Sequence, residues 1–408
     1  MKNRRLVVQK YGGSSIATLE RVKEIAKRIA YYTRKGKKVV VVVSAMGDTT
    51  DNLIGLAEKI SPEPSERELD MLISTGEQIS IALLAMALHE IRISAVSFTG
   101  SQVGIITDKF HTRAKIVRID SKKIRDALKS NKVIVVAGFQ GSTSTKDIAT
   151  LGRGGSDLTA VALAASLKAS VCEIYTDVQG IYTADPRLVE GARKLDCISF
   201  DEMLELASRG AQVMQTRAVE AAKKHGVTLH VRSSFSRQGG TRIMKKRVSF
   251  EEPVVRGVTL TEKEVKLTIC KVPDKPGVAA KIFQRLSAKH INIDMIVQNV
   301  SHKRITDISF TVTKQQANAA LAITKAIAKE IKAGKVLYDK DIAKVSIVGI
   351  GMKTHAGVAH GMFGVLSKNK INIEMISTSE ISVSCIIKKQ KARQAVRALH
   401  KTFGLEKK

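Results

Sequence analysis

The chain has 408 residues, so we expect two or three domains that each bury their own core, and a small disulfide-stapled scaffold is excluded. Hydrophobic residues make up 44% of the chain, and the longest apolar run, residues 39–43, is far too short to span a membrane. Because the apolar stretch near the start covers only residues 6–8, we expect no signal peptide, no membrane partner and a cytoplasmic location.

The formal net charge is +30, from 68 basic and 38 acidic residues. A charge of this size first suggests nucleic acid, because cations near phosphates release counter-ions. Residues 249–408 hold 28 basic and 13 acidic residues, an excess of +15, and the remainder of the chain holds the other +15. Because the charge is spread evenly and aromatic residues are only 4%, we interpret it as a lysine-rich surface and predict no nucleic-acid partner.

Residues 1–245 alternate short β-branched runs with helical patterns, which predicts an α/β domain with a mainly parallel sheet. A 3.6-residue apolar period predicts a helix over Leu19–Arg34 that stops at Gly36, and Ser65 with Glu68 predicts a capping box. The predicted strands are Leu6–Gln9, Val39–Ser44, Ala95–Phe98, Val133–Ala137, Val171–Thr176 and Thr228–Arg232.

An internal repeat follows. Residues 274–296 and 354–376 share 11 identities in 23 positions at an offset of 80, which chance does not produce. We therefore predict a linker at 246–262 and two copies of a small α+β module, at 263–340 and 341–408. The strands predicted for the two copies are Val265–Cys270, Asp307–Thr313, Val345–Val348 and Ser382–Ile387, with a further strand at each I-N-I motif.

The first predicted strand runs into the sequence K-Y-G-G-S-S, residues 10–15. Glycines let backbone N–H groups approach phosphate oxygens, and Lys10 adds a positive charge, so this turn can cradle a phosphate. Taken alone, a Gly-Gly pair after a strand is more often a simple tight turn. The four cysteines form no C-x-x-C pair and the histidines no H-E-x-x-H motif, so we predict no built-in metal site.

Three further polar clusters, at residues 43–51, 151–160 and 175–187, are predicted to lie at the same edge of the sheet. Ligands of open α/β sheets bind at the carboxyl ends of the strands, and arginine between glycines suits a carboxylate or phosphate. Each cluster alone can be a helix N-cap or a turn. Four clusters together predict a site for a mononucleotide and a small anion.

These clusters resemble the aspartate kinase family through K-Y-G-G-S-S, V-S-A-M-G-D-T-T-D, S-T-G-E, S-F-T-G-S-Q, V-A-G-F-Q-G, L-G-R-G-G-S-D and T-D-V-Q-G-I-Y-T-A-D-P-R. The repeat resembles the paired ACT domains of that family, so the resemblance covers essentially the whole chain. It implies a three-layer amino-acid kinase domain with a mainly parallel sheet, followed by two ferredoxin-like α+β ACT domains.

The resemblance implies transfer of the γ-phosphoryl group of ATP, with Mg²⁺, to the side-chain carboxylate of L-aspartate. The product, 4-phospho-L-aspartate, leads toward lysine, threonine and methionine. The acceptor carboxylate is already deprotonated near pH 7, so the difficulty is bringing it to a polyanion rather than removing a proton. The family also implies feedback inhibition by lysine, threonine or both, and homo-oligomers joined through the ACT domains, with or without a regulatory-only subunit.

Residue by residue, the resemblance implies a catalytic group of Lys10, Glu77, Arg153 and Asp157. The implied aspartate-binding residues are Ser44, Thr50, Glu77, Arg153, Gly154, Gly155, Ser156 and Asp157. The implied ATP-binding residues are Lys10, Tyr11, Gly12, Gly13, Ser14, Ser156, Thr176, Asp177, Tyr182, Arg187, Gln212 and Val213. The implied effector-binding residues are Asp274, Lys275, Pro276, Gly277, Asn292, Ile293, Asp294, Gln298, His355, Gly357, Asn372, Ile373 and Glu374.

The sequence departs from the family pattern at two places. Gln212 stands where the family usually has a lysine, a loss that Arg209 or Arg217 would have to compensate, and His355-Ala356-Gly357 lacks the usual proline. Two alternatives stay open: another amino-acid kinase that acts on glutamate, N-acetylglutamate or UMP, and a non-catalytic basic ACT regulator.

Overall fold

The computed structural model describes residues 3–210, 213–245, 254–299, 304–350, 352, 355 and 357–406. The chain divides into two compact units. The first contains the residues up to Ile181, Lys194–Ala207 and the stretch that carries α8 to β12. The second contains Tyr182–Arg193, a short segment that begins at Ser208, and the residues from β13 to the C-terminus.

The first unit is built on an eight-stranded sheet with the order β10-β12-β11-β9-β1-β2-β6-β3. The neighbours from β11 to β3 pair in parallel, and β12 pairs antiparallel with β11, so the predicted mainly parallel sheet is confirmed. The strands are β1 (Asn3–Tyr11), β2 (Lys38–Val43), β3 (Ala95–Phe98), β6 (Val133–Ala137), β9 (Ala169–Thr176), β10 (Cys197–Ser199), β11 (Leu229–Ser233) and β12 (Thr241–Met244).

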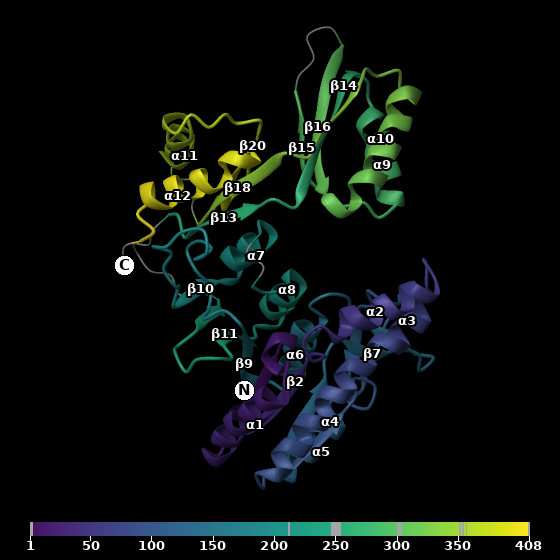
Figure 1. The fold of residues 1–408 in the computed structure, drawn as a ribbon, viewed down its shortest axis with the longest axis vertical. Helices are drawn as coiled ribbons and strands as arrows, with labels where there is room; N and C mark the ends of the chain where they lie inside the picture. The colour runs from purple at the N-terminus through teal and green to yellow at the C-terminus, as the bar shows by residue number, and fades with distance from the viewer. Residues whose placement is uncertain are drawn as a thin grey trace. The chain divides into compact units, whose positions relative to one another are not determined.

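Helices cover both faces of this sheet. On one face α1 (Leu19–Arg34) packs beside α4 (Thr75–Glu90), as Figure 1 shows, over the side chains of Val39, Val41 and Val43. Successive strand residues point to opposite faces, so Val42 faces the other layer, where it lies near Ser156 of α6 (Gly155–Ser166). That layer also contains α5 (Lys122–Lys129) and α8 (Thr216–His225), and α7 (Phe200–Ser208) follows β10 directly.

Helix α1 has the bounds that its apolar period predicts. The backbone N–H of Arg21 donates to the Thr18 hydroxyl at the N-terminus, and Gly36, at φ 71°, follows the last turn. The predicted capping box is wrong in its detail. Ser65 precedes α3 (Glu66–Ile73), but its side chain makes no capping hydrogen bond.

A second, four-stranded sheet in the first unit was not predicted. Its order is β5-β4-β7-β8, and its strands are β4 (Ile105–Thr107), β5 (Ile116–Ile119), β7 (Gln140–Ser142) and β8 (Ile148–Thr150). The fully buried carboxylate of Asp70 anchors it by accepting from the backbone N–H groups of Thr112 and Thr150, at 3.0 and 2.9 Å. Helix α2 (Thr49–Ile60) packs on α3 nearby.

One helical stretch, Glu66–Glu90, is long and apolar enough to cross a membrane by composition alone. Half of its apolar window is buried inside the protein, and this stretch contains the buried residues Asp70 and Glu77. Its apolar character is explained by packing against β2, β3, β6 and α1.

The first repeat folds as a β-α-β-β-α-β module with the sheet order β15-β16-β14-β17. All of its neighbouring strands pair antiparallel, and both helices pack on the sheet through a core that includes Leu267, Ile282 and Phe310. Its elements are β14 (Glu264–Pro273), α9 (Val278–Ala288), β15 (Ile293–Gln298), β16 (Ile305–Thr313), α10 (Ala317–Glu330) and β17 (Val336–Asp339).

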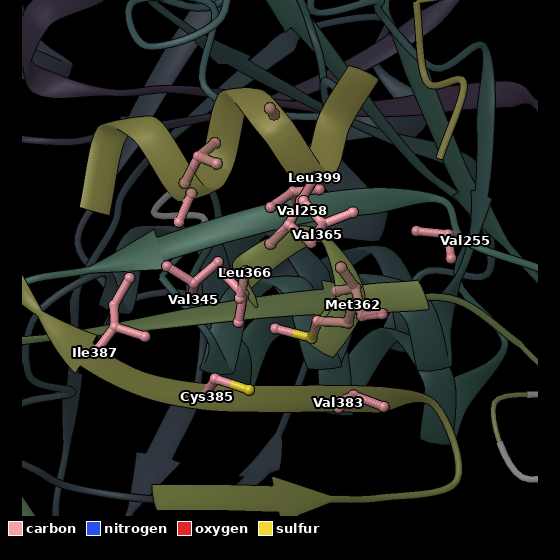
Figure 2. Close-up of a cluster of buried hydrophobic side chains, with 14 of the residues drawn as sticks. Val255, Val258, Val345, Met362, Val365, Leu366, Val383, Cys385, Ile387 and Leu399 are labelled. Carbon is pink, nitrogen blue, oxygen red and sulfur yellow. The ribbon is translucent and has the colours of Figure 1, made fainter. Parts of the chain in front are cut away.

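The second repeat has the same sheet plan, in the order β13-β18-β20-β19, but takes its edge strand from before the first repeat. Figure 2 shows Val258 of β13 in one hydrophobic core with Met362 and Leu399 of the helices. The elements are β13 (Gly257–Thr261), β18 (Ile342–Val348), α11 (Gly357–Lys368), β19 (Met375–Thr378), β20 (Ser382–Lys388) and α12 (Ala392–Thr402). The predicted linker is therefore wrong over 257–261, because these residues pair antiparallel with β18.

The segment Tyr182–Arg193 also belongs to the second repeat, although the predicted boundary placed it in the catalytic domain. Ala184 and Val189 lie in the same hydrophobic core as Val258, and the Thr183 hydroxyl lies 2.9 Å from Nε2 of the buried His400. The Thr183 carbonyl accepts from the backbone N–H of Val258 at 2.7 Å. Three separate stretches of chain thus build this one module.

Candidate functional site

The amino end of α6 meets the carboxyl end of β1. Nζ of Lys10 lies 2.7 Å from Oδ1 of Asp157, and only 13% and 9% of the two side chains are exposed. Lys10 also lies over the glycine turn, since a Cβ on Gly12 would be 3.2 Å from Nζ. The sequence prediction that brings Lys10 and Asp157 to one edge of the sheet agrees with this geometry.

The turns that follow β1 and β2 pack backbone against backbone. The N–H of Gly47 donates to the Gly13 carbonyl at 3.2 Å, and a Cβ on Gly13 would lie 3.0 Å from the carbonyl oxygens of Ala45 and Gly47. A side chain at Gly13 would force these turns apart. Gly13 and Ser14 begin a short 3-10 helix, η1 (Gly13–Ile16), with Ser14 exposed at its first turn.

Two hydroxyl groups line the same edge. The Ser44 hydroxyl, at the end of β2, donates to the Ser156 hydroxyl, in the first turn of α6, at 3.0 Å. Gly138, directly after β6, leaves room for this pair, because a Cβ there would lie 2.6 Å from Oγ of Ser156. Thr50 is half-buried in the first turn of α2.

The carboxylate of Glu77 enters this region from the first turn of α4. Its side chain is nearly fully buried, and Oε1 accepts from the backbone N–H of Ala45 at 3.0 Å. Burial raises the pKa of Glu77 to about 7, against the opposing effect of that hydrogen bond. The other oxygen, Oε2, has no hydrogen-bond partner among the described residues. A cationic group could therefore pair with it.

Arg153 lies in the turn before α6 and differs from its neighbours. Its side chain is 92% exposed, and NH2 is 3.5 Å from Oδ1 of Asp51 in α2. By contrast, the following residues Gly155, Ser156 and Asp157 are buried at the start of the helix. The arginine is therefore available to turn toward an anion at this edge.

Two residues that the site prediction omitted hold this turn. Nε2 of Gln215 donates to the Arg153 carbonyl at 2.6 Å, and Gly154, at φ 72°, lies too close to Gln215 to carry a side chain. The Arg217 guanidinium donates to the carbonyls of Leu151 and Ala114, at 2.8 and 3.0 Å. In this structure Arg217, which the sequence suggested as a substitute for the nucleotide-side lysine, holds this turn. The Q-T-R sequence, residues 215–217, was the available signal.

The residues predicted to bind ATP beyond the glycine turn are divided between the two compact units. Thr176 ends β9 and Asp177 follows it. The Thr176 hydroxyl donates to the Asp177 carboxylate at 2.9 Å, and Val213 is half-buried. Tyr11, a predicted ATP-binding residue, does not present its side chain at this edge. Its ring is fully buried and stacks on Tyr175 at 4.7 Å, because its place in β1 points it into the α1-side core.

Tyr182 and Arg187 belong to the second unit. There the Arg187 guanidinium donates to both carboxylate oxygens of Asp185, which lowers the pKa of Asp185. Gln212 lies outside the described residues. Arg209, the other predicted substitute for a lysine, lies in the second unit, where NH1 is 3.5 Å from Oδ1 of Asp294.

Two of the predicted effector-binding carboxylates are already paired across the repeats. Asp294 of the first repeat pairs with the fully buried Lys344 of the second, which also pairs with Glu264 at 2.6 Å. Reciprocally, Glu374 of the second repeat pairs with Lys266 of the first. Both carboxylates therefore form ion pairs that join the two repeats. An effector that binds either carboxylate would have to displace its lysine partner.

The other predicted effector positions are mostly exposed. Those of the first repeat lie in the turn before α9 and along the edge strand β15, and those of the second lie before α11 and β19. The exposed or half-buried members are Asp274, Lys275, Pro276, Gly277, Asn292, Ile293, Gln298, His355, Gly357, Asn372 and Ile373. Gly277 caps α9 at φ 91°, which explains a glycine there without a ligand.

No group of three or more His, Cys, Asp or Glu side chains is placed to hold a metal ion within the described ranges. The described side chains therefore do not form a protein cage for Mg²⁺. The four cysteines are free thiols, two of them buried.

Comparison with known proteins agrees with the geometry. The description of the amino acid kinase family matches residues 5–233, and that of the ACT domain matches 271–326 and 345–403. The chain is 52% identical to aspartate kinase of Stutzerimonas stutzeri over 402 residues, 98% of each chain. It is 50% identical to aspartokinase of Mycobacterium tuberculosis over 405 residues, 98% of this chain and 96% of the other.

Solved structures show the same likeness. Aspartokinase III of E. coli, in complex with aspartate and ADP, superposes with a TM-score of 0.80 at 26% identity, covering 97% of this chain and 99% of that one. Its complex with lysine and aspartate gives a TM-score of 0.77, also at 26% identity, over 98% and 99% of the chains. With both parts of the chain matched and half of all residues identical to those of known relatives, the chain belongs to the aspartate kinase family, enzymes that phosphorylate a carboxyl group.

Proposed function

We propose that this protein transfers the γ-phosphoryl group of ATP to the side-chain carboxylate of L-aspartate. One observation carries the proposal: Lys10, Ser44, Ser156, Asp157 and Glu77 converge at one edge of the parallel sheet. That edge combines one ammonium, backbone donors of a glycine turn, and carboxylates that can hold an ammonium. It suits an amino acid with a second carboxylate better than UMP.

Lys10 is the group that meets the transferring phosphoryl group in this proposal. Its pairing with Asp157 fixes the ammonium above the glycine turn, and the positive charge lowers the repulsion between the acceptor carboxylate and the triphosphate. The N–H groups of Gly13 and Ser14 hold phosphate oxygens, and that of Gly12, which donates to the Tyr175 carbonyl at 3.4 Å, would have to change partner to join them. No general base is needed, because the attacking carboxylate is ionised near neutral pH.

Arg153 and Glu77 orient the amino acid. The exposed Arg153 guanidinium leaves Asp51 and takes the α-carboxylate through two hydrogen bonds, while Oε2 of Glu77, together with Asp157, accepts from the ammonium. Ser44, Thr50, Gly154, Gly155 and Ser156 line the same side. The described side chains form no cage for Mg²⁺, so this ion would come with ATP and would supply charge neutralisation of its phosphates.

On the nucleotide side we assign Thr176, Asp177 and Val213, with Tyr182, Arg187 and Gln212. The E. coli relative at 26% identity was solved with aspartate and ADP, which supports a nucleotide and aspartate as ligands of this fold.

We also propose feedback inhibition by lysine, threonine or both through the two repeats. The segment Tyr182–Arg193 supports a route, because it carries two proposed nucleotide ligands and is packed into the core of the second repeat. An effector that shifts this repeat would shift Tyr182 and Arg187 with it. The lysine complex of the same E. coli relative supports lysine as one effector. We also propose that the protein forms homo-oligomers through the repeats, with or without a regulatory-only subunit. We place the reaction in the cytoplasm, at the entry to lysine, threonine and methionine synthesis.

The activity test is an ATP-dependent aspartyl hydroxamate assay on the full chain. L-Aspartate should give hydroxamate, whereas glutamate, N-acetylglutamate and UMP should not serve as acceptors when nucleoside diphosphate release is measured. Equal release with any of these three would replace aspartate as the substrate, and no release with any acceptor would favour a non-catalytic regulator.

Regulation is tested by repeating the assay with lysine and threonine, separately and together, and by titration calorimetry with each. We expect inhibition and heat from at least one of them. Val189→Ala should weaken the inhibition, because it loosens the segment that joins the nucleotide side to the second repeat, whereas Val117→Ala, at an exposed site of the first unit, should not. No heat from either amino acid would remove the regulatory proposal.

A further inference from the structure

The first unit contains a cavity apart from the proposed kinase site, which we call the α1 pocket. It lies between α1 and the segment 233–237 that follows β11, has a volume of about 640 Å³, and is partly open. Its lining includes Tyr175 of β9 and Ser15, which follows the glycine turn in the sequence. None of the residues assigned above to aspartate or ATP lines it.

Positive charge dominates the lining. Arg21, Lys27, Arg28, Arg232 and Arg237 line the α1 pocket, and Glu24 is the single carboxylate among the described lining residues. Glu24 pairs with Lys27 at 2.8 Å. The even spread of charge along the sequence therefore conceals a local concentration, which the fold brings together from α1 and the end of β11.

The guanidinium groups are held mainly by neutral partners. Arg28 donates to the Ser234 carbonyl at 2.8 Å and lies over the Tyr175 ring at 4.8 Å, while Arg21 donates to the Ser14 carbonyl and lies over the Phe235 ring at 4.7 Å. Carbonyl groups and rings fix the position of a guanidinium without cancelling its charge. Among the described residues, Arg232 forms a salt bridge with Glu173 at 3.2 Å, a buried carboxylate outside the lining, and Arg28 and Arg237 lie near enough to Glu24 to lower its pKa. The pocket thus keeps a net positive charge in a fixed arrangement.

One polar group in the lining, the Ser236 hydroxyl, makes no hydrogen bond to the described residues. Its oxygen atom is buried. Buried hydroxyl groups normally have one, so this group indicates a place for a water or a ligand atom. Two large aromatic side chains of the lining, Tyr31 and Phe235, remain 57% and 53% exposed.

We propose that the α1 pocket binds a small polyanion, carried by phosphate or carboxylate groups, at a site separate from the kinase site. The ligand would meet Arg28 and Arg237 from two sides, with the Ser236 hydroxyl as a donor. The pocket touches the phosphate turn, because Arg21 in its lining donates to the Ser14 carbonyl. A bound anion would therefore change the rigidity of the proposed phosphate turn. This effect on the turn rests on the proposed function, whereas binding of the anion in the α1 pocket does not.

The test is titration calorimetry on the full chain with three probes: AMP, inorganic pyrophosphate and citrate. We expect at least one to bind, and the comparison among them identifies phosphate or carboxylate as the preferred group. Arg237→Gln and Arg28→Gln should each weaken that binding roughly tenfold or more, because each removes a charge-assisted contact. Lys23→Gln, on α1 outside the lining, and Lys10→Ala, in the kinase site, should leave it unchanged.

Arg237 is exposed, so Arg237→Gln should fold normally even if Arg28→Gln does not, and circular dichroism checks both. Absence of binding by all three probes would overturn the proposal. Binding that is lost in Lys10→Ala but kept in Arg237→Gln would overturn it as well, by assigning the anion to the kinase site. The aspartyl hydroxamate assay without added anion reports separately on catalysis, which Arg237→Gln should not change.

Discussion

The ammonium of Lys10 and the carboxylate of Asp157 form a largely buried ion pair, 2.7 Å apart, between β1 and the first turn of α6. The pair joins two segments that are far apart in the sequence and places a charge above the glycine turn. If the ammonium meets the transferring phosphoryl group, its loss should act on the transition state. It also leaves the largely buried Asp157 carboxylate without its cation, so thermal unfolding must be measured beside the rate.

We expect Lys10→Ala to lower kcat roughly 10²- to 10³-fold in the hydroxamate assay, the usual effect of losing one transition-state cation. Lys23→Ala, on the exposed side of α1, is the matched control and should keep full activity. Near-normal turnover by Lys10→Ala would show that another cation meets the phosphoryl group.

Glu77 should make aspartate binding depend on pH. Burial raises its pKa to about 7, so below that pH the carboxyl group is neutral and cannot pair with the ammonium of aspartate. We expect KM for aspartate to rise as the pH falls below about 7, and Glu77→Gln to raise KM at all pH values and remove this pH dependence. Initial rates between pH 6 and 9 at saturating ATP give the measurement.

The raised pKa of Glu77 also affects stability: low pH, which weakens aspartate binding, should favour the folded state. The folded state binds this proton more tightly than the unfolded chain does, so the contribution is full below the ordinary pKa of a glutamate and is lost as the pH rises through about 7. We expect the free energy of unfolding to fall by up to about 3 kcal/mol across that window, and Glu77→Gln to flatten the curve. A flat wild-type curve in urea denaturation would contradict the shifted pKa.

Arg153 should matter for binding and not for folding. Its side chain is 92% exposed, so Arg153→Ala should change the free energy of unfolding by no more than about 0.5 kcal/mol. Loss of the two hydrogen bonds to the α-carboxylate should raise KM for aspartate roughly 10- to 100-fold. Arg34→Ala, at the exposed end of α1, is the control. An unchanged KM in Arg153→Ala would assign the α-carboxylate to another group.

Lys344 should be essential for the stability of the second unit. It is fully buried between Glu264 and Asp294, so Lys344→Met would leave two carboxylates without their cation, at a cost of about 3 kcal/mol or more. The double variant Lys344→Met with Glu264→Gln should recover part of that loss. Thermal unfolding measures both, and a single variant as stable as the wild type would show that the pairing contributes little.

The strand β13 yields a different kind of prediction. Val258 is buried in the core of the second repeat, so Val258→Asp should destabilise that repeat by at least about 3 kcal/mol, because it places a charge in an apolar site (Figure 2). Lys263→Asp, at an exposed position just beyond the strand, should have little effect. If both variants melt like the wild type, these residues would behave as a linker after all.

Elements with a strong local pattern were predictable. The helix over Leu19–Arg34 and the strands Ala95–Phe98 and Val133–Ala137 have the predicted bounds, since an apolar period is a local property of the chain. The strand β13 was missed because five residues after a charged cluster read as a linker. Its partner is some 80 residues away, with Thr259 opposite Ser346, and no local signal reports such a pairing.

The site divides in the same way. Strand ends of a parallel sheet meet at one edge, which is why Lys10 and Asp157 could be predicted to be neighbours. The direction of Tyr11 was not predicted, because the motif carries no information about which face of β1 a side chain takes. The packing of Ala184 and Val189 into the second repeat is a tertiary contact that the family motif does not reveal.

The place of β13 in the second repeat also orders the assembly of the chain. The whole first repeat is inserted between β13 and β18, so during synthesis it can complete its fold while β13 still waits for the strand it pairs with. The sheet of the second repeat is completed last, when β18 pairs with β13 on one side and with β20 on the other. A shorter polypeptide made only of the two repeats would have to start upstream of Gly257, because one that began at the first repeat would leave β18 as an open edge ready to pair with another chain.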